Sequence, residues 1–67
     1  MNELLYIIED DEGVQEVYES AFEDFYNLKI FSNGKDFFEA FNLEKPDLII
    51  VDIMLPDMDG YKIISDI

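Results

Sequence analysis

Residues Leu48 to Gly60 read Leu-Ile-Ile-Val-Asp-Ile-Met-Leu-Pro-Asp-Met-Asp-Gly. The first four residues are apolar, and a short apolar run is typical of a strand that is buried on both faces. The run breaks at Pro56 and Gly60, so Asp52 is expected at the carboxyl end of that strand. In open α/β sheets this edge is where ligands bind. Because an isolated buried carboxylate is unfavourable, we expect Asp52 to have a partner there, and a cation is the best candidate.

Residues 4–8 have the same apolar character and are also a predicted strand. Residues 28–31 are a further short predicted strand, with Lys29 inside it. Between them, spacings of three and four predict one helical stripe, formed by Val14, Val17, Tyr18, Ala21, Phe22 and Phe25. Residues 35–41 are a second predicted helix with Phe37, Phe38 and Phe41 on one face, which Pro46 ends. A last helix is expected after Pro56, with Asp57 or Asp59 as its cap. Its inner face is predicted to carry Gly60, Ile63, Ile64 and Ile67.

Strands and helices therefore alternate with short connections, which predicts an α/β fold with a parallel sheet. With 67 residues, the chain is expected to form one small domain over residues 1–67. Its final residue, Ile67, is apolar and falls within the helical pattern, without a cap, glycine or proline after it. Natural termini more often end in polar residues, so we expect that the chain is cut within its fold.

The composition excludes several classes of function. The chain has no cysteine and no histidine, so disulfides, histidine nucleophiles and most zinc chemistry are ruled out. Its 17 acids and 4 basic residues give a net charge of −13, which argues against direct binding to nucleic acid or to an anionic membrane. No signal peptide or membrane-spanning stretch is found, so a cytoplasmic location is expected. Cations and basic protein surfaces are the expected partners.

Glu9-Asp10-Asp11-Glu12 directly follows the first predicted strand. If the first and third strands are neighbours, Glu9, Asp10 and Asp52 converge at one edge of the sheet. Oxygen ligands without nitrogen or sulfur select Mg²⁺, Mn²⁺ or Ca²⁺. A carboxylate beside such an ion suits phosphoryl transfer to Asp52, with Asp10 as the main ligand and Glu9 as a second.

Two other interpretations remain open. An aspartate after a strand is often only a cap or turn residue, and the chain would then be an interaction fragment without phosphorylation. Phosphatases of the haloacid-dehalogenase type also use a strand-end aspartate with Mg²⁺. They usually have another aspartate two positions later, where this chain has Met54, and we therefore expect a protein that is not an enzyme.

Three motifs carry a resemblance to a known family. They are Leu-Tyr-Ile-Ile-Glu-Asp-Asp-Glu at the first strand, Ser-Asn-Gly before the second helix, and Lys-Pro-Asp-Leu-Ile-Ile-Val-Asp-Ile-Met-Leu-Pro-Asp-Met-Asp-Gly. In the last motif, Leu55, Pro56 and Gly60 follow Asp52 at the spacing of the family. Over essentially its whole length, the chain resembles the N-terminal half of a response regulator receiver domain from two-component signalling.

The resemblance implies a flavodoxin-like fold with strand order 2-1-3-4-5, of which this chain would hold 2-1-3. It implies that Asp52 is the phosphoacceptor for a phosphohistidine of a sensor histidine kinase. Glu9, Asp10 and the main-chain oxygen of Met54 would complete a Mg²⁺ site with Asp52. The positions that would shape this site are Asp11, Pro56 and Gly60.

The departures from the family are also informative. A full receiver is about twice as long. The later strands, with a Ser or Thr that binds the phosphoryl group, an aromatic switch residue and a lysine, have no counterpart here. Switching by the family mechanism is therefore not expected of this chain as given. With strand order 2-1-3 the third strand is an open edge, and we expect a two-fold homodimer that pairs two third strands.

Overall fold

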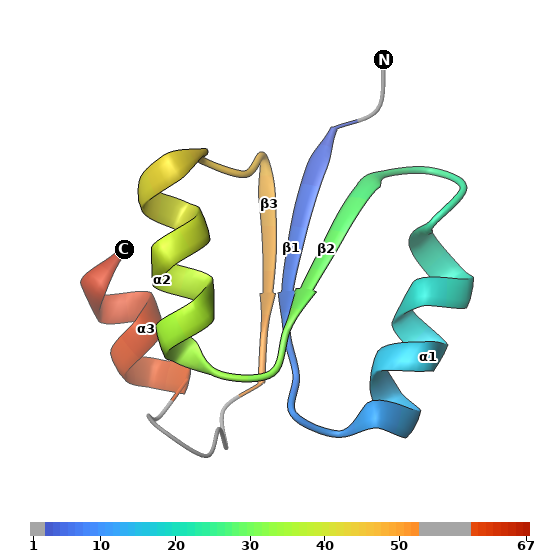
Figure 1. Ribbon diagram of the computed structural model, residues 1–67, viewed down its shortest axis with the longest axis horizontal. Helices are drawn as coiled ribbons and strands as arrows, with labels where there is room; N and C mark the ends of the chain where they lie inside the picture. The colour runs from blue at the N-terminus through green and yellow to red at the C-terminus, as the bar shows by residue number, and fades with distance from the viewer. Residues whose placement is uncertain (1–2, 53–59) are drawn as a thin grey trace.

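The computed structural model describes residues 3–52 and 60–67. Strands and helices alternate along this part of the chain in the order β1 (Leu4–Ile8), α1 (Glu12–Phe22), β2 (Asn27–Phe31), α2 (Gly34–Leu43), β3 (Leu48–Val51) and α3 (Gly60–Asp66). The strands form one parallel sheet in the order β2-β1-β3, which confirms the predicted flavodoxin-like arrangement. Figure 1 shows α1 on one face of this sheet and α2 with α3 on the other.

β1 is the central strand, and all five of its residues are buried. Its last residue, Ile8, pairs with Phe31 of β2 on one side and with Val51 of β3 on the other. This register brings the carboxyl ends of the three strands to one edge of the sheet, at the lower side of Figure 1. The apolar residues of β1 are covered on both faces, and burial of each such side chain contributes about 1.5–3 kcal/mol. The carboxyl ends of the strands are therefore positioned by β1, whose residues are all buried.

The hydrophobic core lies between the sheet and the α2–α3 layer. Tyr6, Phe37 and Ile63 are at most 1% exposed, and they belong to one buried cluster. Tyr6 and Phe37 meet edge to face at 6.2 Å. Phe37 also packs edge to face against Phe38 and at a tilt against Phe41. The prediction that the three phenylalanines share one inner face of α2 is confirmed. Asn33 caps this helix, because its side chain accepts from the N–H of Asp36.

The predicted apolar stripe of α1 is only partly correct. No residue of α1 is buried, and Val17 is 66% exposed. Phe25 was predicted in the same stripe, but α1 ends at Phe22 and Phe25 is 70% exposed. Helical spacing predicts which side chains share a face, but their burial needs an element packed over that face. Among the described residues, no helix or strand packs over Val17.

The predicted inner face of α3 is also partly wrong. Ile63 is fully buried, whereas Ile64 is 58% exposed and Ile67 is 53% exposed. Ile64 lies about 100° round the helix from Ile63, and Ile67 lies beyond the last helical residue, so neither reaches the core. Asp57 and Asp59, the predicted caps of this helix, lie outside the described residues.

Candidate metal and phosphoacceptor site

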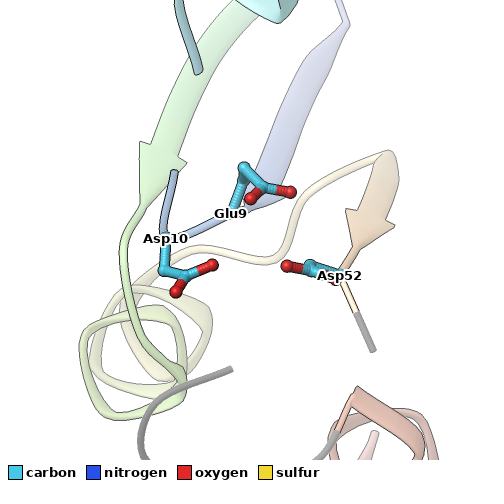
Figure 2. Close-up of side chains that lie close together, drawn as sticks. All are labelled: Glu9, Asp10 and Asp52. Carbon is cyan, nitrogen blue, oxygen red and sulfur yellow. The ribbon is translucent and has the colours of Figure 1, made fainter. Parts of the chain in front are cut away.

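Three carboxylates meet at the carboxyl edge of the sheet. Glu9 and Asp10 follow β1, Asp52 follows β3, and one carboxylate oxygen from each lies within 4.8 Å of those of the other two. Figure 2 shows the carboxyl groups of Asp10 and Asp52 pointing toward one another across the gap between the two strand ends. The convergence of these three residues was predicted from the sequence and is confirmed.

Main-chain hydrogen bonds hold the carboxylates in this place. The N–H of Asp52 donates to the oxygen of Ile8 at 2.9 Å, and the N–H of Glu9 donates to the oxygen of Phe31 at 2.9 Å. Both bonds continue the strand pairing one residue beyond the last strand positions. The two acidic side chains therefore emerge from backbone that is still part of the sheet.

Glu9 is the buried member of the cluster, with 9% of its surface exposed. Its burial is the main cause that raises the pKa of the Glu9 carboxyl, and the charges of Asp52, Asp10 and Asp11 raise it further. The hydrogen bond from the N–H of Asp11 to Oε1 of Glu9, at 3.1 Å, opposes this rise in the pKa. A cation at the same place would favour the ionised form of all these groups.

The other two carboxylates are more accessible, since Asp52 is half-buried and Asp10 is exposed. A site with one buried and two accessible oxygen ligands leaves room for water and for an oxygen of a substrate. This is the donor set that Mg²⁺ prefers, because it binds few carboxylates and keeps several waters. The residues present therefore fit a divalent, oxygen-preferring cation.

The remaining predicted site residues lie elsewhere or outside the described residues. Asp11 does not belong to the converging group: its Oδ1 accepts from the N–H of Val14 at 3.1 Å and caps α1. Gly60 is the first residue of α3. Met54 and Pro56 lie outside the described residues, and their predicted roles stay predictions.

One contact at this edge was not predicted from the sequence. The side-chain amide of Gln15, the fourth residue of α1, donates to the main-chain oxygen of Glu9 and to Oγ of Ser32. A polar residue early in a helix that follows an acidic run is the only signal of it in the sequence. Hydrophobic periodicity carries no information about a contact between residues so far apart.

Fold and site together define a parallel α/β protein with an acidic ligand site at the carboxyl edge of its sheet. The sequence of residues 5–67 matches the family model of the response regulator receiver domain. The chain therefore belongs to the response regulator receiver domain family.

Several curated proteins are similar to the chain. The transcriptional regulatory proteins KdpE of Staphylococcus aureus and CssR of Bacillus subtilis are each 35% identical over all of this chain. Those alignments cover 29% and 30% of the two regulators. Sporulation initiation phosphotransferase F of Bacillus subtilis is 31% identical over 97% of the chain, which is 53% of its own length. The chain thus spans less than a third of the two regulators and about half of the phosphotransferase.

No solved structure is significantly similar to the chain. Among the described residues, no helix combines the length and the apolar character needed to cross a bilayer.

Proposed function

We propose that the chain is a phosphoacceptor module in which Asp52 receives a phosphoryl group from a phosphohistidine of a sensor histidine kinase. The observation that carries this proposal is the meeting of three carboxylates within 4.8 Å at the sheet edge, one of them buried. Membership of the receiver family supports it, since receiver domains bind Mg²⁺ at an acidic pocket and interact with such kinases.

In the proposed step, a carboxylate oxygen of Asp52 attacks phosphorus and forms a P–O bond. The P–N bond of the phosphohistidine breaks, and its electron pair stays on the imidazole nitrogen. The product is an acyl phosphate on Asp52, and the chain itself is the acceptor rather than a catalyst that turns over. The accessibility of Asp52 permits this attack, while the main-chain bond to Ile8 holds its backbone in place.

Glu9, Asp10 and Asp52 are the proposed holders of Mg²⁺, and Mn²⁺ or Ca²⁺ would suit the same oxygen ligands. When bound, the ion would neutralise the negative charge of the phosphoryl oxygens. The main-chain oxygen of Met54 is a further proposed ligand, and Asp11, Pro56 and Gly60 are proposed to shape the surroundings. Residues 1–67 are proposed to act as one receiver unit, in the cytoplasm.

Incubation of the chain with acetyl phosphate and Mg²⁺ tests the proposal. We expect a stoichiometric adduct that hydroxylamine removes and that is lost in Asp52→Asn. Asp24→Asn, which alters an exposed acid in the turn after α1, is the matched control and should form the adduct normally. An unmodified chain, or an adduct that persists in Asp52→Asn, would contradict the assignment. Release of phosphate over many turnovers would instead indicate an enzyme.

A second candidate function is self-association without phosphorylation. β3 is an edge strand of the described sheet, and its first residue, Leu48, is 43% exposed. An apolar edge strand is a template for pairing, and a two-fold dimer would extend the sheet to six strands. A dimer that forms no adduct with acetyl phosphate would favour this function over the first.

A further inference from the structure

Gln15 connects the ends of two strands at the acidic edge. Its side-chain amide has two N–H groups, and the structure gives that amide two acceptors. One is the main-chain oxygen of Glu9, and the other is Oγ of Ser32, at 3.1 Å. Glu9 directly follows β1 and Ser32 directly follows β2, so one side chain of α1 joins both strand ends.

These contacts complete a set of hydrogen bonds around Glu9. Its main-chain N–H donates to the main-chain oxygen of Phe31, and its main-chain oxygen accepts from the side-chain amide of Gln15. Its carboxylate accepts from the main-chain N–H of Asp11. The N–H of Gln15 also donates to the main-chain oxygen of Asp11 at 2.9 Å. The segment from Glu9 to Asp11 is therefore tied to the sheet on one side and to α1 on the other.

The carbonyl of Glu9 belongs to the peptide unit that joins Glu9 to Asp10. Because that unit is planar, a hydrogen bond that sets the direction of the carbonyl also sets the direction in which the chain continues to the Cα of Asp10. Asp10 is exposed and has no core packing of its own, so its approach to Asp52 depends on this backbone. Without Gln15, the peptide has one fewer restraint on the orientation of Asp10.

We propose that Gln15 is a positioning residue of the cation site, acting through the Glu9–Asp10 peptide and not by contact with the ion. This inference rests on the proposed function, since it assumes that Glu9, Asp10 and Asp52 hold Mg²⁺. It assigns to α1 a role in keeping the three carboxylates in a geometry that fits the ion before the ion arrives. Ser32 is the second anchor of the same side chain.

The test is a Mg²⁺ titration of the full chain followed by NMR shifts of the Glu9, Asp10 and Asp52 amides. Gln15→Met keeps the length and helix propensity of the side chain but removes both donors. We expect the dissociation constant for Mg²⁺ to rise about three- to tenfold, as for the loss of one or two hydrogen bonds. Ser32→Ala removes one acceptor only, and we expect a smaller rise of about twofold.

Phosphorylation by acetyl phosphate separates positioning from a general structural defect. In Gln15→Met, the Mg²⁺ concentration for half-maximal rate should rise as the dissociation constant does. The rate at saturating Mg²⁺ should change by less than about twofold, because Asp52 itself is unaltered. Tyr6→Phe, altered in the core at the opposite face of the sheet from α1, is the control for lost stability and should bind Mg²⁺ normally.

Three other results of these measurements would contradict the positioning role of Gln15, each for a different reason. If Gln15→Met and Ser32→Ala both bind Mg²⁺ as the unaltered chain does, the positioning role is wrong while the proposed function stands. If Tyr6→Phe weakens Mg²⁺ binding as much as Gln15→Met, the effect is one of stability and the role is again wrong. If the unaltered chain binds no Mg²⁺, the proposed function fails and the role of Gln15 fails with it. Should Gln15→Met not fold, Ser32→Ala alone decides by the same criterion.

Discussion

The main-chain N–H of Asp52 donates to the main-chain oxygen of Ile8 over 2.9 Å. This bond extends the pairing of β1 with β3 by one residue and sets Asp52 beside Glu9, the residue after Ile8. The separation of the two carboxylates is therefore determined by the register of the sheet. Carboxylates held together in this way repel one another when no cation is present, and this repulsion has measurable consequences.

Asp52→Asn removes one of the three clustered charges with little change of shape. We expect the metal-free variant to gain about 0.5 kcal/mol in its free energy of unfolding, as for other partly exposed charge contacts. Mg²⁺ at ten times its dissociation constant should stabilise the unaltered chain by about 1.4 kcal/mol, and the variant much less. Urea unfolding followed by circular dichroism measures both. Equal stabilisation of the two chains by Mg²⁺ would show that Asp52 is not a ligand.

The raised pKa of Glu9 predicts a pH dependence of stability in the absence of Mg²⁺. The folded chain holds the proton of Glu9 to a higher pH than the unfolded chain, whose pKa is near the ordinary value of 4.5. The stability that protonated Glu9 contributes is therefore fully present below pH 4.5, the pKa of the unfolded chain. This stability is lost as the pH rises from 4.5 through the raised pKa of the folded chain. In Glu9→Gln the contribution is absent. Unfolding free energies measured from about pH 4 to 7 should converge for the two chains at the acidic end and favour Glu9→Gln at neutral pH.

Asp11 has a structural role that Glu9 and Asp10, the two acids before it, do not share. Because its side chain caps α1 through the N–H of Val14, Asp11→Ala should lower the free energy of unfolding by about 1 kcal/mol. Asp11→Asn keeps an acceptor oxygen at the same position and should be nearly neutral. Thermal unfolding of the two variants checks this. Equal losses would mean that the charge of Asp11, and not its cap, supports the helix.

The hydroxyl of Tyr6 donates to the main-chain oxygen of Glu44 at 2.9 Å, just beyond the end of α2. Tyr6→Phe keeps the ring in the core and should lower the free energy of unfolding by about 1 kcal/mol, the usual loss for one hydrogen bond.

Burial, and secondarily the charge of Glu44, raise the pKa of Tyr6 above its ordinary 10.0. The stability linked to protonated Tyr6 is therefore complete below pH 10.0 and is lost as the pH rises through the folded pKa. Alkaline unfolding should begin at a higher pH in Tyr6→Phe than in the unaltered chain, relative to their stabilities at pH 7.

The strands and the meeting of the acids were predictable because both follow from local pattern and from general rules for parallel sheets. A run such as residues 48–51 indicates a buried strand by itself, and the carboxyl ends of parallel neighbours share an edge. The exposure of Val17 and Ile64 was not predictable, because burial of a helix face depends on which element covers it. The link from Gln15 to Ser32 was not predictable either, since it joins side chains whose contact depends on the final placement of α1. The expected strand order and the expected roles of the site residues came chiefly from the resemblance to receiver domains. The family match confirms that resemblance, and the sheet confirms the order β2-β1-β3.

The last prediction concerns β3, which is an edge strand of the sheet that the described residues form. The chain is expected to dimerise at micromolar concentration by pairing two β3 strands, which sedimentation velocity can measure. Leu48→Lys places a charge on that edge at a position already 43% exposed, so it should favour the monomer without unfolding the chain. Leu43→Lys is the matched control, because it makes the same change at a 90% exposed residue that belongs to α2 and not to β3. A folded monomer for the unaltered chain, or equal loss of the dimer in both variants, would exclude pairing through β3.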